Sequence, residues 1–171
     1  MADGVFGVEV VTPEQSLFAG GANSVVLETS VGALTVLDGH MSLIGDVAPC
    51  LVKVDQADGS LLRMAVHGGF LQVDTSPGAA EGLAEGDGPL PGLSTKVTVL
   101  AGVAELASEI DVPRSERAKE AATQRMADLG SGRGSKTESD EDGEAPDSML
   151  AEAQQALARA ELRLEVANQA D

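Results

Sequence analysis

Short apolar runs separated by turn sequences fill the first part of the chain. Between residues 5 and 74, runs such as VFGVEVV, SVVLET, CLVKV and GFLQV alternate with turn-forming stretches such as AGGAN, LDGH and QADGS. The runs recur about every 8–12 residues, and no helical period is sustained. This pattern predicts a set of short strands that form an antiparallel β-sandwich or barrel.

A segment rich in glycine and proline interrupts the strand pattern at residues 75–95, TSPGAAEGLAEGDGPLPGLST. Eight of its 21 residues are glycine or proline and three are acidic. Because such a composition buries little apolar surface, we expect a flexible loop. The strand pattern resumes at KVTVLAG and VAELAS. The loop is therefore predicted to be inserted into one β domain that spans residues 1–111.

The spacing of apolar residues changes to that of a helix near residue 112. Asp111 is a candidate N-cap, Pro113 falls in the first turn and Gly130 is a stop signal. The apolar positions at helical spacing are Ala118, Ala122, Met126 and Leu129. Residues 131–148 follow with two basic and six acidic side chains, a composition that predicts an acidic flexible loop.

A second helix is predicted from Ser148 onward. Its apolar stripe repeats every seven residues in two interleaved series, which are Leu150, Leu157 and Leu164, and Ala153, Ala160 and Ala167. The small alanines allow a partner helix to approach closely, and the preceding helix is the obvious partner. We therefore predict an α+β protein, with an N-terminal antiparallel β-sandwich followed by a C-terminal antiparallel two-helix hairpin over residues 112–171.

Composition narrows the classes of function. The net charge is −17, and the aromatic side chains are three phenylalanines with no tryptophan or tyrosine. A chain this acidic is repelled by nucleic acids and anionic membrane surfaces, and it has few rings on which bases could stack. We see neither a run long enough to span a membrane nor a signal-peptide pattern, so a cytosolic location is expected.

Residues suited to catalysis or metal binding are sparse. The chain has two histidines, His40 and His67, and one cysteine, Cys50, too few for a zinc site or a nucleophilic triad. The segment GSGRGSKT carries Ser135 where a phosphate-binding P-loop needs glycine, and it follows a helix instead of a strand. The segment ESDEDGEAPDSM has Met149 where a calcium loop needs a bidentate acid. We therefore expect no required cofactor or metal and no independent enzymatic activity.

Four sequence blocks, in order, resemble the ε subunit of bacterial F-type ATP synthases. The first block, VEVVTPEQSLFAGGANSVVLETSVGALTVLDGHMSLI, fits the family's V-x-x-P-E-x-x-L-F-x-G and T-x-x-G-x-x-x-x-L-x-x-H patterns. Its matching residues are Thr12, Pro13, Glu14, Leu17, Phe18, Gly20, Thr29, Gly32, Leu37 and His40. The blocks AVHGGFLQV, KVTVLAGVAELASEID and ALARAELRL follow, so the resemblance covers about 130 residues.

The resemblance implies a ten-stranded sandwich, a two-helix hairpin and a non-catalytic role. The sandwich would belong to the central stalk of a proton-driven ATP synthase and would grip the γ subunit and the ring of c subunits. The hairpin would modulate ATP hydrolysis by folding on the sandwich or by extending into the catalytic head of α and β subunits. The protein would then be peripheral to the cell membrane, on its cytoplasmic side, through the complex.

Two sets of site residues follow from the resemblance. The loop LDGHMS, with His40 and Met41, would face γ or the c ring. In several bacterial members the folded hairpin binds ATP through a segment like I-D-x-x-R-A and arginines of the last helix. The matching residues are Glu105, Ile110, Asp111, Arg114, Arg159 and Arg163, while Ser115 replaces the alanine and Ala121 replaces a basic residue.

Alternatives remain open for the arginines and for the whole chain. Arg159 and Arg163 carry like charges four residues apart, which suits a polyphosphate. They could equally form surface ion pairs with Glu161 and Glu165, or contact acidic residues of the catalytic head. For the chain, the alternatives are a free-standing ATP-sensing module and a structural β-sandwich adaptor.

Overall fold

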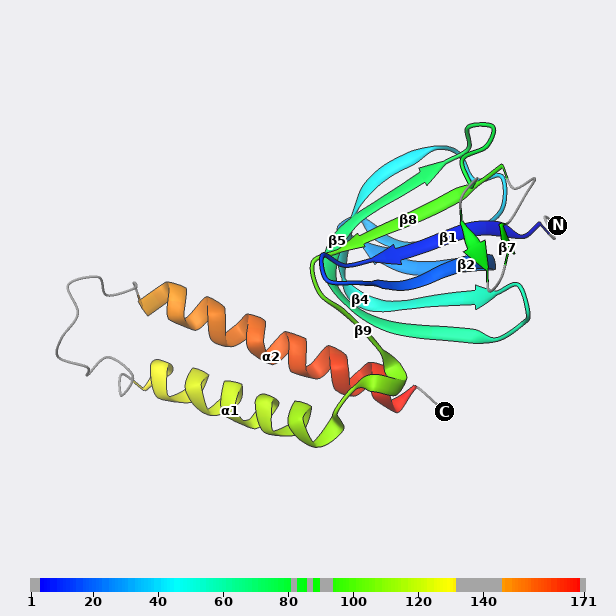
Figure 1. Cartoon of the computed structure of the whole chain (residues 1–171). Coiled ribbons are helices and arrows are strands. Elements are labelled where there is room, and N and C mark those ends of the chain that lie inside the picture. Colours follow the sequence, from blue (N-terminus) through cyan, green and yellow to red (C-terminus); the bar gives the residue numbers. More distant parts are fainter. Residues whose placement is uncertain (1–3, 81–82, 86–87, 90–93, 132–145, 170–171) are drawn as a thin grey trace. The chain divides into compact units, whose positions relative to one another are not determined.

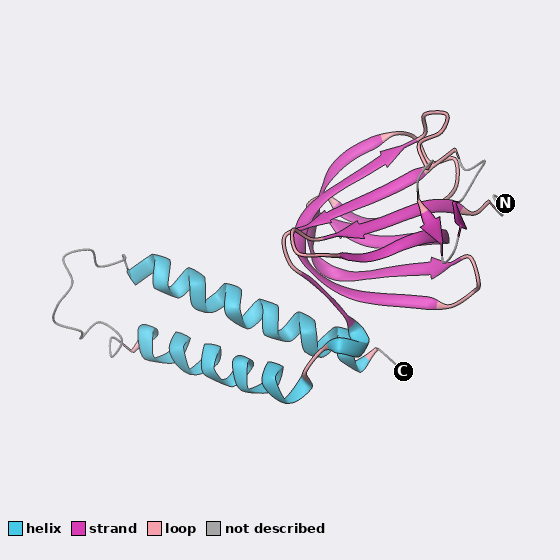
Figure 2. Cartoon of the chain, viewed as in Figure 1, coloured by secondary structure: helices cyan, strands magenta, loops and turns pink. Residues whose placement is uncertain are grey.

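The computed structural model describes residues 4–80, 83–85, 88–89, 94–131 and 146–169 (Figure 1). The chain divides into two compact units, and the division falls between Glu109 and Ile110. The first unit is built of strands and the second of two helices, as colouring by secondary structure shows (Figure 2). This division lies within two residues of the boundary predicted from the sequence at 111/112.

Seven strands and a short helix make up the body of the first unit, and two very short strands lie outside it. The body consists of β1 (Phe6–Val11), β2 (Ser16–Thr29), β3 (Gly32–Val36), β4 (Leu43–Gln56), β5 (Leu61–Asp74), β8 (Lys96–Ala101) and β9 (Ala104–Leu106), followed by the 3-10 helix Ala107–Glu109. The short strands are β6 (Ala84–Glu85) and β7 (Gly88–Pro89), which pair with each other.

The long strands β2, β4 and β5 have 14 residues each, and parts of each pair with different neighbours. The first part of β5 pairs with β9, and its second part pairs with β8. Likewise, β2 pairs first with β1 and then with β3. The resemblance implied ten strands, whereas the described residues form a sheet of seven strands and a separate pair of short ones. The number is smaller because β2 and β5 each run on without a break while they change neighbours.

Pairing of β1 with both β2 and β8 closes the sheet on itself. The hydrogen-bonded order is β1-β8-β5-β4-β2-β3. Because β1 also pairs with β2, the five strands β1, β8, β5, β4 and β2 form a closed ring, and β3 lies beside β2 outside it. The contacts between β1 and β8 are parallel, whereas every other pairing in this sheet is antiparallel. Sequence periodicity does not reveal this one parallel pair, because it joins strands about 90 residues apart.

The interior of the sandwich is filled by aliphatic side chains from alternate strand positions. Its fully buried members include Phe6, Val8, Val10, Val25, Leu27, Val36, Val52, Val54, Met64, Val66, Leu71, Val97 and Val99. Valine dominates because β-branched residues fit the pleated surface of a strand. Cys50 is also buried here, and desolvation raises the pKa of its thiol.

The segment expected to be a flexible loop at 75–95 is partly packed against the sandwich. Ala80 is fully buried and Leu83 is 4% exposed. Leu83 has room to pack against β1 because residue 7 is glycine, since a Cβ there would lie 2.5 Å from Leu83 Cδ1. Two apolar side chains of a glycine-rich stretch are therefore buried, and Leu83 packs against a strand distant in the sequence. Other residues of this segment, 81–82, 86–87 and 90–93, lie outside the described part.

The second unit is an antiparallel hairpin of α1 (Val112–Gly130) and α2 (Pro146–Asn168). The predicted start of α1 is confirmed, because the Asp111 carboxylate accepts a hydrogen bond of 2.9 Å from the Arg114 backbone N–H and Pro113 lies in the first turn. The helix ends at Gly130, as expected. Residues 132–145 of the expected acidic loop lie outside the described residues, and α2 begins at Pro146, two residues before the predicted Ser148.

Most of the buried residues of the hairpin are small. In α1 they are Ser115 and Ala122, and in α2 Ala153 and Ala160 are buried as the heptad repeat predicts, together with Leu162 and Val166. The leucines of the repeat, Leu150, Leu157 and Leu164, are half-buried. Ala118, which we expected on the buried stripe, is exposed. The Ser115 hydroxyl donates to the Asp111 carbonyl oxygen at 2.9 Å, so its burial leaves the hydroxyl satisfied.

We predict that Leu83→Ala destabilises the sandwich by about 2 kcal/mol, because it removes a buried aliphatic side chain and leaves a cavity above Gly7. Thermal unfolding of the purified chain measures the effect. Leu61→Ala is the matched control, because Leu61 is 44% exposed at the start of β5. Equal midpoints for the two variants would show that the packing of Leu83 against Gly7 contributes nothing to the stability of the sandwich.

Candidate functional site

The loop that carries His40 joins β3 to β4 and is held by backbone contacts. The His40 backbone N–H donates to the Leu37 carbonyl at 3.1 Å, and Gly39 occupies a left-handed conformation with φ +75°. The Gly39 N–H donates to Oγ1 of the buried Thr95 at 3.1 Å. His40 Nδ1 lies 2.9 Å from the Met41 carbonyl oxygen, and because a carbonyl only accepts, this nitrogen carries the proton.

Apolar side chains around this loop are exposed. Met41 is 76% exposed and Ile44 77%, and Leu37 is about half exposed. We call Leu37, Met41 and Ile44, together with His40, the loop surface. Grouped exposed apolar residues of this kind mark contact surfaces on soluble proteins. The sequence-predicted residues His40 and Met41 therefore lie on a surface suited to a protein partner, and Ile44 is a member that sequence reasoning missed.

Two carboxylates next to the loop surface are held in the charged form. Asp46 accepts hydrogen bonds of 2.9 Å from both the hydroxyl and the backbone N–H of Ser30, which lower its pKa below the ordinary value. Asp74 accepts equivalent bonds from Ser76 at 2.7 and 2.8 Å, and its pKa is lowered for the same reason. The loop surface thus has a fixed acidic border.

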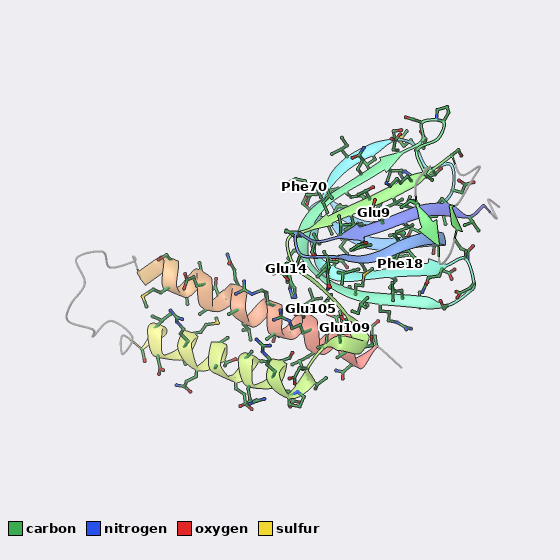
Figure 3. The ribbon with its side chains drawn as sticks, viewed as in Figure 1. Glu9, Glu14, Phe18, Phe70, Glu105 and Glu109 are labelled. Atoms are coloured by element: carbon green, nitrogen blue, oxygen red, sulfur yellow. The ribbon has the colours of Figure 1, made fainter. Side chains whose placement is uncertain are left out.

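A second apolar surface surrounds a hollow of about 750 Å³ on the sandwich. Phe70 and Leu100 are cross-strand neighbours on β5 and β8, and both are exposed. Figure 3 shows the Phe70 side chain on the outside of the sandwich. Pro13 and His67 also line the hollow. We call these four residues the Phe70 surface. Sequence reasoning missed it, because alternation alone does not tell which side of a strand faces outward.

The two apolar surfaces adjoin each other on β4 and β5. Ile44 pairs with Gln72, and Asp46 pairs with Phe70 two residues further along β4. Ile44 of the loop surface and Phe70 of the other are therefore diagonal neighbours on one face of the sheet, with Asp46 and Gln72 at the other two corners. The sandwich consequently presents two adjoining apolar contact areas with polar side chains beside their junction.

The residues expected to hold ATP are divided between the two units. Glu105 lies on β9 of the first unit, whereas Ile110, Asp111, Arg114, Arg159 and Arg163 belong to the second. Within the hairpin, Asp111 is engaged as the N-cap of α1. Arg159 is exposed and Arg163 is half-buried on α2. Glu161, an alternative partner for these arginines, instead has its carboxylate 3.1 Å from Lys119 Nζ on α1.

A groove of about 440 Å³ runs between the helices and brings further charged groups beside Arg159. Its walls are Ala118, Ala121, Ala122, Arg125, Glu152, Ala153, Gln155, Ala156 and Arg159. Arg125 was not among the predicted site residues. Its position one turn after Ala121 was the available signal, because residues four apart share a helix face. The structure therefore places one arginine from each helix in the same groove.

The described residues were compared with the ligand sets of metal sites. No group of three or more His, Cys, Asp or Glu side chains there is arranged to hold a metal ion. Residues 132–145, which make up most of the GSGRGSKT and ESDEDGEAPDSM segments, lie outside the described part of the chain. Neither described helix is long and apolar enough to cross a membrane.

Comparisons with known proteins identify the family. Residues 5–77 match the family model for the ATP synthase, Delta/Epsilon chain, beta-sandwich domain. The ATP synthase epsilon chain of Streptomyces griseus is 35% identical over 129 residues, which cover 71% of this chain and 89% of that protein. The epsilon chain of a Synechococcus species is 30% identical over 164 residues, covering 96% of this chain and 97% of that one.

The fold also matches a solved structure. A chain from the mitochondrial ATP synthase of Euglena gracilis, in a structure of OSCP, F1 and c-ring, superimposes with a TM-score of 0.66. The match covers 96% of this chain and 81% of that one at 18% identity, so it supports the fold alone. The identities to the curated relatives are high enough, over enough of the chain, to conclude that this protein belongs to the ATP synthase epsilon chain family.

Proposed function

We propose that the sandwich links the γ subunit to the ring of c subunits in the central stalk, and that the hairpin modulates ATP hydrolysis. The observation that carries this proposal is the division into two compact units, one with exposed apolar contact surfaces and one without a large apolar interior. As an epsilon chain, the protein is a non-catalytic subunit of ATP synthase. It would reach the cytoplasmic side of the membrane only through this complex.

The two apolar surfaces of the sandwich support a linking role. A linker needs a contact area for each partner, and the loop surface and the Phe70 surface together extend the exposed apolar area from the loop between β3 and β4 along β5 to β8. The net charge of −17 opposes direct attachment to an anionic membrane. Attachment through apolar protein contacts is consistent with both observations.

The weak packing of the hairpin supports a regulatory role. Among its described residues only Ser115, Ala122, Ala153, Ala160, Leu162 and Val166 are buried, so far less apolar area is buried in the hairpin than in the sandwich. Two ion pairs between the helices, Lys119–Glu161 and Arg125–Glu152, have side chains about half exposed, and such pairs are worth about 0.2–1 kcal/mol each. A hairpin held together this weakly can change conformation at low cost, as a movable regulator requires.

A second candidate function, ATP sensing by the folded hairpin, is favoured by the arginines. Arg159 lines the groove between the helices, and Arg163 follows one turn later. Each guanidinium can donate two parallel hydrogen bonds to phosphate oxygens. A bound triphosphate would offset the repulsion between these two cations.

Changing His40 and Met41 together to Asp is expected to weaken assembly with γ and the c ring, because two charges would then have to be desolvated at the interface. Co-purification of the complex measures the loss. The matched control is Ala57→Asp with Leu61→Asp, which adds the same charge at the turn between β4 and β5. Unchanged assembly of the first variant would remove the loop surface from the interface.

Removing residues 113–171 is expected to leave assembly intact and to raise ATP hydrolysis by the complex. The sandwich is a compact unit of its own, and the proposal assigns the inhibition of hydrolysis to the hairpin. Steady-state hydrolysis by the reconstituted enzyme measures the effect. An unchanged rate with normal assembly would show that the hairpin does not restrain hydrolysis.

Arg159→Ala combined with Arg163→Ala is expected to reduce ATP affinity at least about tenfold, because charge-assisted hydrogen bonds are worth about 1.5–3 kcal/mol each. Calorimetric titration of the full chain with ATP measures it. Lys53→Ala with Arg63→Ala, a cross-strand pair on β4 and β5, removes the same charge from the sandwich as a control. The absence of heat at millimolar ATP with folded wild-type protein would exclude ATP binding.

A further inference from the structure

We propose that Glu152 is a built-in competitor for the anion-binding groove of the hairpin. Its carboxylate holds Arg125 in an ion pair, and a chain of phosphates, such as that of a nucleoside triphosphate, must displace it to engage both groove arginines. This inference rests on the proposed binding of ATP to the hairpin. It adds a regulatory residue, Glu152, and a binding residue, Arg125, that the sequence did not suggest.

The composition of the groove makes charge its main means of recognition. Five of its nine lining residues are alanines, which contribute no polar side-chain group. The charged members are Arg125, Arg159 and Glu152, so the groove carries a formal charge of +1 and would carry +2 without Glu152. Arg125 comes from α1 and Arg159 from α2. An anion bound to both would therefore bridge the two helices.

The ion pair that occupies Arg125 is open to exchange. Arg125 Nη2 lies 3.7 Å from Glu152 Oε2, and the two side chains are 53% and 54% exposed. That separation exceeds the usual length of a charge-assisted hydrogen bond, and water competes at such exposure. A phosphate can instead accept two parallel bonds from the guanidinium. The incoming anion therefore replaces a weak contact with a stronger one.

The second ion pair between the helices provides a matched control. Lys119 Nζ lies 3.1 Å from Glu161 Oε1, with similar exposure, and neither residue lines the groove. Glu152→Gln and Glu161→Gln each remove one acid and one interhelical ion pair, and both raise the net charge by one. Only Glu152→Gln frees an arginine inside the groove. A difference in anion affinity between the two variants therefore arises from the groove, and not from the change in net charge or from the loss of an interhelical ion pair.

The test is calorimetric titration of the full chain with ATP and, separately, with inorganic triphosphate, at low salt. Glu152→Gln is expected to tighten binding about three- to fivefold, the range set by the weakness of an exposed ion pair, while Glu161→Gln leaves it unchanged. Arg125→Gln is expected to weaken binding, and Lys119→Gln is not. In the Arg125→Gln background, Glu152→Gln should have no further effect on affinity, because the arginine for which Glu152 competes with the anion is then absent.

Each outcome supports or overturns the proposal. If the wild type binds ATP and the two glutamine variants behave alike, competition by Glu152 is refuted while ATP binding stands. If Glu152→Gln binds and the wild type does not, competition is supported and the native hairpin is not an ATP sensor. If no variant binds, with helical content confirmed by circular dichroism, both proposals fail. Tighter binding that persists in the Arg125→Gln background would show that Glu152 acts directly on the ligand.

Discussion

The bend of β5 at Gly68 and Gly69 is the constraint on which the sandwich depends. Both glycines have positive φ values, +105° and +159°, and a Cβ on Gly69 would collide with the Leu100 carbonyl oxygen. The bend lies between the part of β5 that pairs with β9 and the part that pairs with β8. Phe70 follows directly after the glycines on the exposed surface, so the change of neighbour and the second contact surface occur at the same place in the strand.

Local patterns allowed the sequence to predict most of the fold. The Asp111 cap, Pro113 and the Leu–Ala repeat of α2 act within a few residues of one another, and the helices follow them. By contrast, the packing of Leu83 against Gly7 and the parallel pairing of β1 with β8 are contacts between segments far apart in the sequence. Such contacts leave no periodic signal, which is why residues 75–95 were expected to be a loop throughout.

The candidate sites, too, could be predicted from the sequence only in part. His40 and Met41 could be proposed from the resemblance, and the structure adds the exposure of Met41 and the neighbouring Ile44. Arg125 could not be found from a motif, because its importance comes from the packing of α1 beside α2. Motifs therefore indicated where to look on the chain, while the register between elements decided which side chains meet.

The alanine-rich interior of the hairpin also has a thermal consequence. The heat-capacity change of a conformational transition scales with the apolar area that it exposes. The buried apolar residues described in the hairpin are Ala122, Ala153, Ala160, Leu162 and Val166, far fewer than in the core of the sandwich. The equilibrium between closed and open hairpins should therefore vary more gently with temperature than the unfolding of the sandwich does.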